Sequence, residues 1–367
     1  MHTPSLVIGL ALIAIVLWDA FETVVLPRTV SRRIRLARLY FRGTWMPWAR
    51  VAATFESDSR RERFLAIYGP LSLIGLLTVW ATGLIVGFAV LQWSDGSQLV
   101  TPAGAARFLD DLYMSGTTFF TLGLGDVHPN SAFIARFLTV LEGGTGFGFL
   151  AVVISYFPVL YQSFSRREIR LTLLDAWAGS PPAAAEILRR LGSAGELKAL
   201  DQFLRDWEYW CSELLESHIS YPAVAYFRSQ HQRQAWVSAL AAILDVCALI
   251  LVGIDDVPTW QAHVTFAIAR HAAVDLTQVF RAAPRDDDAR LPADDLEQLR
   301  RQLEGAGLRP RRSPEADARL AELRRSYEPF VIGLGYALMM PMPAWWHPHP
   351  LRDNWQTSPK RDGGPHL

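Results

Sequence analysis

The chain has 367 residues, half of them hydrophobic, and its 36 Lys and Arg residues balance its 36 Asp and Glu residues. This balance indicates no polyanionic partner such as a nucleic acid. Its two cysteines, Cys211 and Cys247, exclude a disulfide framework and a cysteine-based zinc site. The length is sufficient for a membrane module and a second folded domain.

Three apolar stretches are long enough to cross a membrane, residues 4–26, 64–93 and 137–161. The second has no charged residue and, at about 1.5 Å per residue, exceeds a hydrocarbon core of roughly 30 Å. The first lacks a basic start and a cleavage site, so a retained helix is expected rather than a signal peptide. A shorter apolar segment, residues 108–124, is too short and too rich in glycine at its end to span.

The charges predict the orientation of these spans. Arginines greatly outnumber acids between Arg28 and Arg63, and a second basic cluster, Arg166, Arg167 and Arg170, follows the third span. By the positive-inside rule, both regions are expected on the cytoplasmic side of the cell (inner) membrane. The N-terminus and the loop 94–106 are then expected outside.

Beyond the third span, apolar residues recur every three or four positions, which predicts a helical cytoplasmic domain. The expected divisions are an N-terminal span with a basic loop, a pore domain, a helical cytoplasmic domain, a charged linker with a C-terminal helix, and a disordered tail: residues 1–63, 64–165, 166–283, 284–340 and 341–367. Residues 235–254 are read as a core helix. The alternative is a fourth span, in which an unpaired Asp245 would cost roughly 2.5–3.5 kcal/mol.

The segment between the second and third spans has the sequence TLGLGD, from Thr121 to Asp126. A cation entering a dehydrated pore needs its water oxygens replaced, and rings of main-chain carbonyls can do this. Successive carbonyls face one way only if alternate residues adopt conformations open mainly to glycine, and Gly123 and Gly125 have that spacing. The Thr121 hydroxyl adds an oxygen at the inner end, and the Asp126 carboxylate attracts cations at the mouth. Residues 105–119 are expected to form a re-entrant helix whose C-terminal dipole favours a cation.

This segment and its two flanking spans resemble the pore of the potassium-channel superfamily, usually T-V/I-G-Y/F-G-D, over residues 64–165. The resemblance implies a homotetramer in a lipid bilayer that conducts K⁺, with no cofactor. No enzymatic activity is expected, because the sequence has no nucleophile–base or metal constellation, and the charge balance indicates no nucleic-acid partner. The resemblance also implies that K⁺ is coordinated by main-chain oxygens of the filter, with Thr117 and Thr118 as pore-helix support. The coordinating residues are Thr121, Leu122, Gly123, Leu124 and Gly125.

Two positions differ from the family pattern. Leu124 stands where Tyr or Phe is usual, and Thr117 stands where some members have an acid that pairs with the filter aspartate, so Asp126 needs another partner. A weakly selective cation channel is therefore one alternative. A non-conducting membrane signalling or scaffold protein with a degenerate pore is another.

The third span contains candidate gating hinges at Gly144, Gly146, Gly148 and Pro158. Glycine loosens a helix, and proline removes a main-chain hydrogen bond. The alternative for these glycines is close helix packing through Gly144 and Gly148.

Other polar residues give weaker signals. The arginines at 28, 32, 35, 38 and 42 indicate an interfacial amphipathic helix rather than a voltage sensor, because the spans that a sensor needs are missing. Asp19 and Glu22 are expected to form a structural ion pair with Arg28.

Six polar residues of the expected cytoplasmic domain match no metal motif: His218, His231, His263, His271, Asp245 and Asp275. A cytoplasmic ligand of unknown chemistry remains open. The fold expected is an all-α membrane protein with three transmembrane helices, a re-entrant pore helix and an α-helical cytoplasmic domain.

Overall fold

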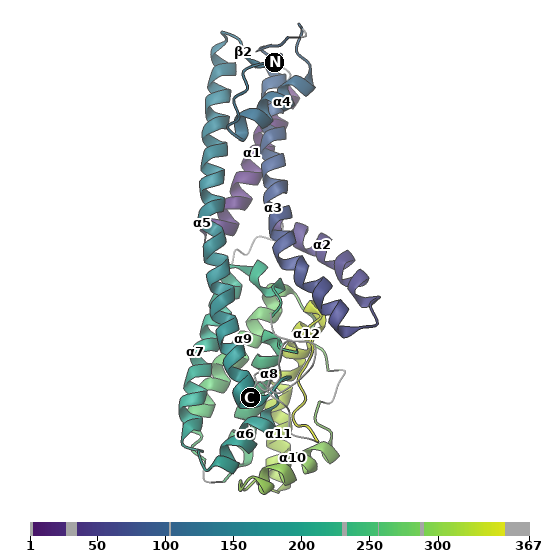
Figure 1. Ribbon diagram of the computed structural model, residues 1–367, viewed down its shortest axis with the longest axis vertical. Coiled ribbons are helices and arrows are strands. Elements are labelled where there is room, and N and C mark those ends of the chain that lie inside the picture. The colour runs from purple at the N-terminus through teal and green to yellow at the C-terminus, as the bar shows by residue number, and fades with distance from the viewer. Residues whose placement is uncertain are drawn as a thin grey trace, which may run out of the picture. The chain divides into compact units, whose positions relative to one another are not determined.

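A computed structural model describes residues 3–26, 35–102, 104–229, 233–255, 257–286 and 290–348. The described chain is helical apart from one short pair of strands, and it divides into two compact units, Met1–Gln162 and Ser163–Leu367 (Figure 1). The elements of the first unit are α1 (Thr3–Ala20), a π-helical turn (Phe21–Val25), α2 (Leu36–Ala53), α3 (Asp58–Ser94), β1 (Leu99–Val100), α4 (Phe108–Phe119), β2 (His128–Pro129) and the first part of α5 (Phe133–Ala178). The second unit contains the rest of α5, α6 (Ala184–Ala194), α7 (Ala199–Ser220), a 3₁₀ turn (Pro222–Tyr226), α8 (Trp236–Gly253), α9 (Trp260–Phe280), α10 (Ala293–Gly305), α11 (Pro314–Arg325) and α12 (Glu328–Leu338).

Long helices of the first unit expose many large apolar side chains. Ile8 on α1, Ile74 on α3 and Val140 and Phe147 on α5 are all exposed. Among the described residues, α1 with its π-helical turn, α3, α5 and α8 are long and apolar enough to cross a bilayer. Continuous exposed apolar surface on helices of this length is what lipid contact requires. The chain is therefore an all-α membrane protein.

Close packing joins α1 to α3. A Cβ atom added at Gly87 would lie 2.6 Å from the Ile13 side chain, and one added at Gly83 would lie 2.8 Å from Val16. These glycines let the two helices approach more closely than larger residues would allow.

Asp19 joins three helices at the end of α1. Its Oδ2 accepts hydrogen bonds from the Trp80 indole on α3, at 2.9 Å, and from the Ala37 main-chain N–H, at 3.0 Å. Ala37 lies in the first turn of α2, so the Asp19 carboxylate caps that helix from another part of the chain. Asp19 therefore has a structural role.

Glu22 forms the ion pair expected of this acidic cluster, but with a different arginine. It lies 3.5 Å from Arg35 and also accepts a hydrogen bond from the Trp18 indole at 2.7 Å. The expected partner, Arg28, lies outside the described residues.

The basic segment forms α2, which packs on the first half of α3. Trp48 stacks on Phe64 with ring centroids 4.4 Å apart, and Trp45 contacts Tyr68 at 4.8 Å. Arg42, on the same helix, is exposed. The helix is thus amphipathic, and its interfacial location stays a prediction. Arg28 and Arg32 lie outside the described residues.

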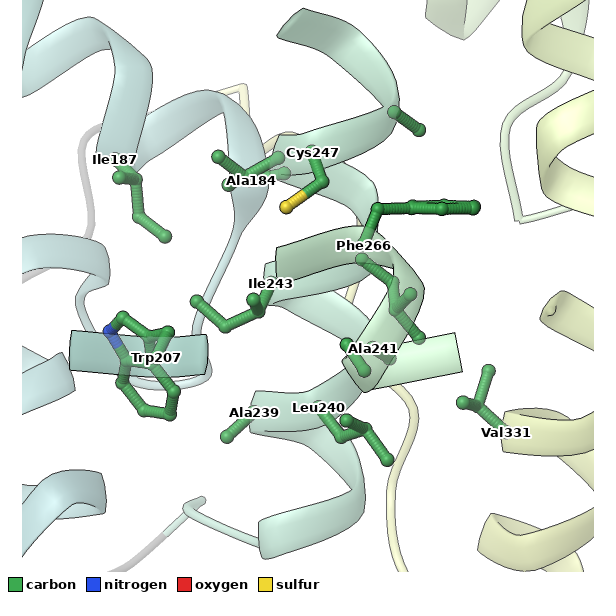
Figure 2. Close-up of a cluster of buried hydrophobic side chains, with 14 of the residues drawn as sticks. Ala184, Ile187, Trp207, Ala239, Leu240, Ala241, Ile243, Cys247, Phe266 and Val331 are labelled. Atoms are coloured by element: carbon green, nitrogen blue, oxygen red, sulfur yellow. The ribbon is translucent and has the colours of Figure 1, made fainter. Parts of the chain in front are cut away.

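The second unit is built around α8. Every residue from Trp236 to Ile250 is buried, and the side chains around Ile243 and Cys247 pack against Trp207 of α7 and Phe266 of α9 (Figure 2). A helix that is apolar on all faces suits either a protein core or a membrane. Because α8 is enclosed by helices of its own unit, a core helix is a better interpretation of these residues than a fourth membrane span.

Asp245, the one acid in α8, has buried partners. Arg290 donates to Asp245 at 2.6 Å, and the Tyr327 hydroxyl donates to its other oxygen at 2.6 Å. Arg290 also donates to the Pro343 carbonyl at 2.8 Å. The buried carboxylate therefore connects α8 to three segments that are distant in the sequence.

The C-terminal region differs in part from the sequence-based expectation. The charged linker contains α10 and α11, which bury Leu299, Leu303 and Leu320. Trp345, in the tail expected to be disordered, is fully buried, and its indole donates to Glu328 at 3.2 Å. Residues 341–348 therefore differ from the expected disorder, because the burial of Trp345 outweighs a local composition rich in proline and histidine. Residues 349–367 lie outside the described part of the chain.

A buried arginine, Arg167, connects the last part of α5 to other elements of the second unit. Arg167 donates to the main-chain carbonyls of Val224, at 3.0 Å, and Phe227, at 2.7 Å, and its Nη1 lies 3.3 Å from His218 Nε2. His218 Nδ1 lies 2.9 Å from the Leu214 carbonyl, which can only accept. Nδ1 thus has the proton, and Nε2 accepts from Arg167. Burial and the adjacent guanidinium lower the pKa of His218 well below its usual value.

Replacing Asp245 with Asn should lower the free energy of unfolding of the second unit by about 3–5 kcal/mol, because the buried Arg290 would lose its nearest counter-charge and, among the described residues, keep only Glu328, at 3.4 Å. Unfolding of the purified full-length protein followed by tryptophan fluorescence measures this change. Asp201→Asn, which removes an exposed pair with Arg205, is the control and should have little effect. Equal stability of D245N and D201N would contradict the role assigned to Asp245.

Acid should destabilise the second unit through His218. Its pKa is lowered on folding, so below about pH 6.5 the unfolded chain binds a proton that the folded chain does not, and stability falls by about 1.4 kcal/mol per pH unit. His218→Gln should reduce this acid dependence, whereas His263→Gln, at an exposed position, should leave it unchanged. Unfolding midpoints measured across this pH range test the prediction, and identical profiles for wild type and H218Q would contradict it.

Candidate ion-conducting site

The helix that precedes the TLGLGD segment is short and begins with acids. In α4, the Asp110 carboxylate accepts a hydrogen bond from the Arg107 main-chain N–H at 2.8 Å, which stabilises the first turn. Asp111 is fully buried and accepts a hydrogen bond from the Ser97 hydroxyl at 2.6 Å. The helix ends at Phe119, close to the end expected from the sequence, and its C-terminus leads directly into Thr121.

Alternate residues of the segment adopt left-handed backbone conformations. The φ angles of Thr121, Gly123 and Gly125 are 57°, 56° and 79°. Glycine adopts such angles without a steric penalty, whereas a β-branched threonine does so only under strain. Backbone strain of this kind is common at ligand-binding positions. The conformation therefore has the alternation that stacked carbonyl oxygens require.

The start of the segment is hydrogen-bonded to the end of α4. The Thr121 N–H donates to the Thr118 carbonyl at 3.0 Å, and the Leu122 N–H donates to the Thr117 carbonyl at 2.8 Å. Thr117 and Thr118 therefore contact the segment through their main chains. Leu122 and Leu124 expose 61% and 63% of their surface in a single chain.

Asp126 has a partner that the sequence analysis did not identify. The Tyr113 hydroxyl on α4 donates to the two Asp126 carboxylate oxygens at 3.0 and 3.3 Å. The hydrogen bond to this carboxylate raises the pKa of Tyr113, which keeps the hydroxyl protonated as a donor. Thr117 is the position where some channels have the acid that pairs with the filter aspartate. Tyr113 lies one helical turn before it on the same face of α4, and this spacing could have identified Tyr113 as the partner.

The chain that leaves the segment is held by the loop after α3. β1 pairs with β2 in antiparallel fashion, with Leu99 opposite Pro129. The Asn130 amide donates to the Gln98 side chain at 2.7 Å, and Asn130 Oδ1 accepts from the Ala132 N–H at 2.8 Å. Both ends of the TLGLGD segment are thereby connected to helices of the same unit.

The glycine-rich part of α5 passes close to the end of α4. A Cβ atom added at Gly146 would overlap the Phe119 carbonyl, and one added at Gly143 would lie 3.8 Å from Thr118. Gly146 thus has a packing reason to be glycine. Gly144 and Gly148 have no atom within 4 Å of an added Cβ, so packing through these two does not occur within one chain. α5 continues as a helix through Pro158, and a gating hinge stays a prediction.

The polar residues of the second unit do not converge on one site. His263 and His271 are exposed, His218 is buried beside Arg167, and Asp245 pairs with Arg290. Within the described residues, no three or more His, Cys, Asp or Glu side chains come together in a group that could hold a metal. His231 lies outside that part of the chain.

The fold defines an all-α membrane protein in which α4 and the TLGLGD segment lie between the long apolar helices α3 and α5. Residues 75–162 match the model of a family described as ion channel, so this part of the chain is an ion-channel domain. The chain is also 22% identical, over 197 residues, to the "Uncharacterized membrane protein YdjJ" of Bacillus subtilis strain 168. That match covers 53% of this chain and 56% of the relative. No solved structure matches.

Replacing Tyr113 with Phe should loosen the end of the TLGLGD segment, because the ring stays but both contacts with Asp126 are lost. Amide hydrogen exchange of residues 121–128 should become several-fold faster. Tyr209→Phe, at an exposed position on α7, is the matched control. Unchanged exchange in Y113F would show that this hydroxyl does not hold the segment.

Proposed function

We propose that the chain is one subunit of a homotetrameric potassium channel of the cell membrane, with Thr121–Asp126 as its selectivity filter. The observation that supports this most directly is the alternation of left-handed residues at Thr121, Gly123 and Gly125, inside the ion-channel domain and between α4 and α5. An alternating backbone turns successive carbonyls to one side, where their oxygens can replace the water around a cation.

The oxygens that would coordinate K⁺ come from the main chain of Thr121, Leu122, Gly123 and Leu124, with the Thr121 hydroxyl at the inner end. The Asp126 carboxylate would raise the local cation concentration at the outer mouth. Conduction of this kind is passive and uses no cofactor. K⁺ is the transported substrate rather than a resident metal.

Four copies are proposed because one chain supplies only one side of a coordination cage. Leu122 and Leu124 flank Gly123 with exposed apolar side chains, which neighbouring copies would cover. Irregular backbone at membrane depth is stable only where protein or a water-filled path surrounds it. A shared axis between copies satisfies both requirements.

The proposed topology follows from charge. The Arg-rich region around α2 and the basic residues Arg166 and Arg170 would lie in the cytoplasm, together with the second unit. The N-terminus and the β1–β2 region would lie outside. This arrangement uses three spans, α1, α3 and α5, and leaves α8 in the core of the cytoplasmic unit.

A weakly selective cation channel is the second candidate, and Leu124 is the observation that favours it. Leucine has no ring or hydroxyl with which to brace the filter from behind. Reversal potentials in opposed K⁺ and Na⁺ solutions distinguish the two candidates: a strong preference for K⁺ supports the first, and equal permeability supports the second. Complete absence of K⁺ flux in liposomes that contain the purified protein would instead favour a third candidate, a non-conducting scaffold.

Replacing Gly123 with Ala should abolish selective K⁺ conduction and leave assembly largely intact. The added Cβ meets no atom within 4 Å, but the φ of 56° costs an L-residue about 1–2 kcal/mol in each copy. Gly116→Ala is the matched control, since Gly116 lies in α4 with open space around it. Flux of K⁺ and Na⁺ into liposomes should distinguish the variants, and normal selectivity in G123A would refute the filter assignment.

A further inference from the structure

Glu142 is a fully buried acid in the otherwise apolar first part of α5. Its Oε1 and the Ser115 hydroxyl on α4 are hydrogen-bonded. None of the salt bridges among the described residues includes Glu142. A buried acid at this position needs a physical reason, because its cost in an apolar environment is high.

The Ser115 hydroxyl has one proton but two oxygen neighbours, and this indicates which group donates to which. Ser115 Oγ lies 2.7 Å from the Ile85 carbonyl oxygen of α3, as well as touching Glu142. A carbonyl oxygen can only accept, and a hydroxyl has a single proton. If Ser115 donates to Ile85, the contact with Glu142 requires a proton on the carboxyl group.

The surroundings of the second carboxyl oxygen also indicate that Glu142 is protonated. Glu142 Oε2 is buried and has no hydrogen-bond partner among the described residues. An ionised carboxylate would leave negative charge on this unpartnered atom, whereas a neutral acid leaves only a weak acceptor there. The arrangement thus favours a chain of donors from Glu142 to Ser115 to Ile85 that joins α5, α4 and α3.

This chain of hydrogen bonds holds α4 one helical turn before its end, close in sequence to the candidate filter. From Ser115, α4 continues for one turn to Phe119, where Gly146 of α5 packs against the main chain and Phe149 contacts the Phe119 ring at 5.6 Å. Thr121 follows two residues later. A shift of α4 relative to α5 would therefore move the filter backbone.

We infer that Glu142 is a positioning residue for the filter: as a neutral carboxylic acid, it donates to Ser115 and fixes α4 against α3 and α5. The inference rests on the proposed conduction through Thr121–Asp126. Glutamine has nearly the same shape, is neutral and can donate through its amide. Alanine leaves Ser115 without this partner and leaves a cavity.

The functional test compares Glu142→Gln with Glu142→Ala in liposomes. E142Q should retain K⁺ flux and selectivity, and E142A should lower the ratio of K⁺ to Na⁺ flux by about tenfold. Glu56→Gln, at an exposed position, is the control and should match wild type. E142A with wild-type selectivity, in a preparation where G123A is defective, would overturn the inference and leave the proposed function intact.

The protonation state is tested by infrared spectroscopy of the reconstituted full chain at neutral pH. A carbonyl band of a protonated carboxylic acid should be present in wild type, in E56Q and in Asp111→Asn, and absent in E142Q. The D111N variant is needed because Asp111 is the other buried acid near this face of α4. A band unchanged in E142Q would overturn the inference. If wild type conducts no K⁺, the proposed function fails, while the infrared band still reports whether Glu142 is protonated.

Discussion

Main-chain polar groups in an apolar medium must have partners, and this requirement explains most of the first unit. The long helices α1, α3 and α5 pair their own main-chain groups and can expose apolar side chains. The TLGLGD segment cannot do so, because its alternating backbone interrupts the α-helical hydrogen-bond pattern after Phe120. Main-chain carbonyls outside a helix need partners from elsewhere, and a dehydrated cation is the partner that the proposed function supplies.

Polar side chains between the helices hold this unusual segment in place. Asp19 joins α1, α2 and α3 at one carboxylate, Ser115 and Glu142 join α4 to its neighbours, and Tyr113 holds Asp126. Asp19, Ser115 and Glu142 are buried, whereas Tyr113 and Asp126 are exposed in the single chain. In an apolar environment such hydrogen bonds are specific, because the alternative for each group is to remain unpaired.

Periodicity and composition predicted much of this architecture. The apolar runs indicated α1, α3 and α5, and glycine spacing indicated the left-handed residues at Gly123 and Gly125. The partners Tyr113 and Glu142 were missed, because a side-chain contact between helices depends on their rotation and depth, which a single sequence does not define. The ordered residues up to Trp345 were missed for a related reason: burial of one tryptophan in the second unit outweighs a local composition typical of disorder.

The helix α5 contributes residues to both units, and its distal part is fixed within the second unit by Arg167. The central claim, however, concerns the filter. A cryo-electron microscopy map of the purified protein in lipid nanodiscs with K⁺ tests it most directly. The account predicts four copies around one axis, with residues 121–126 lining it and ion density between their carbonyl oxygens. An assembly in which these segments lie apart from any shared axis would contradict it.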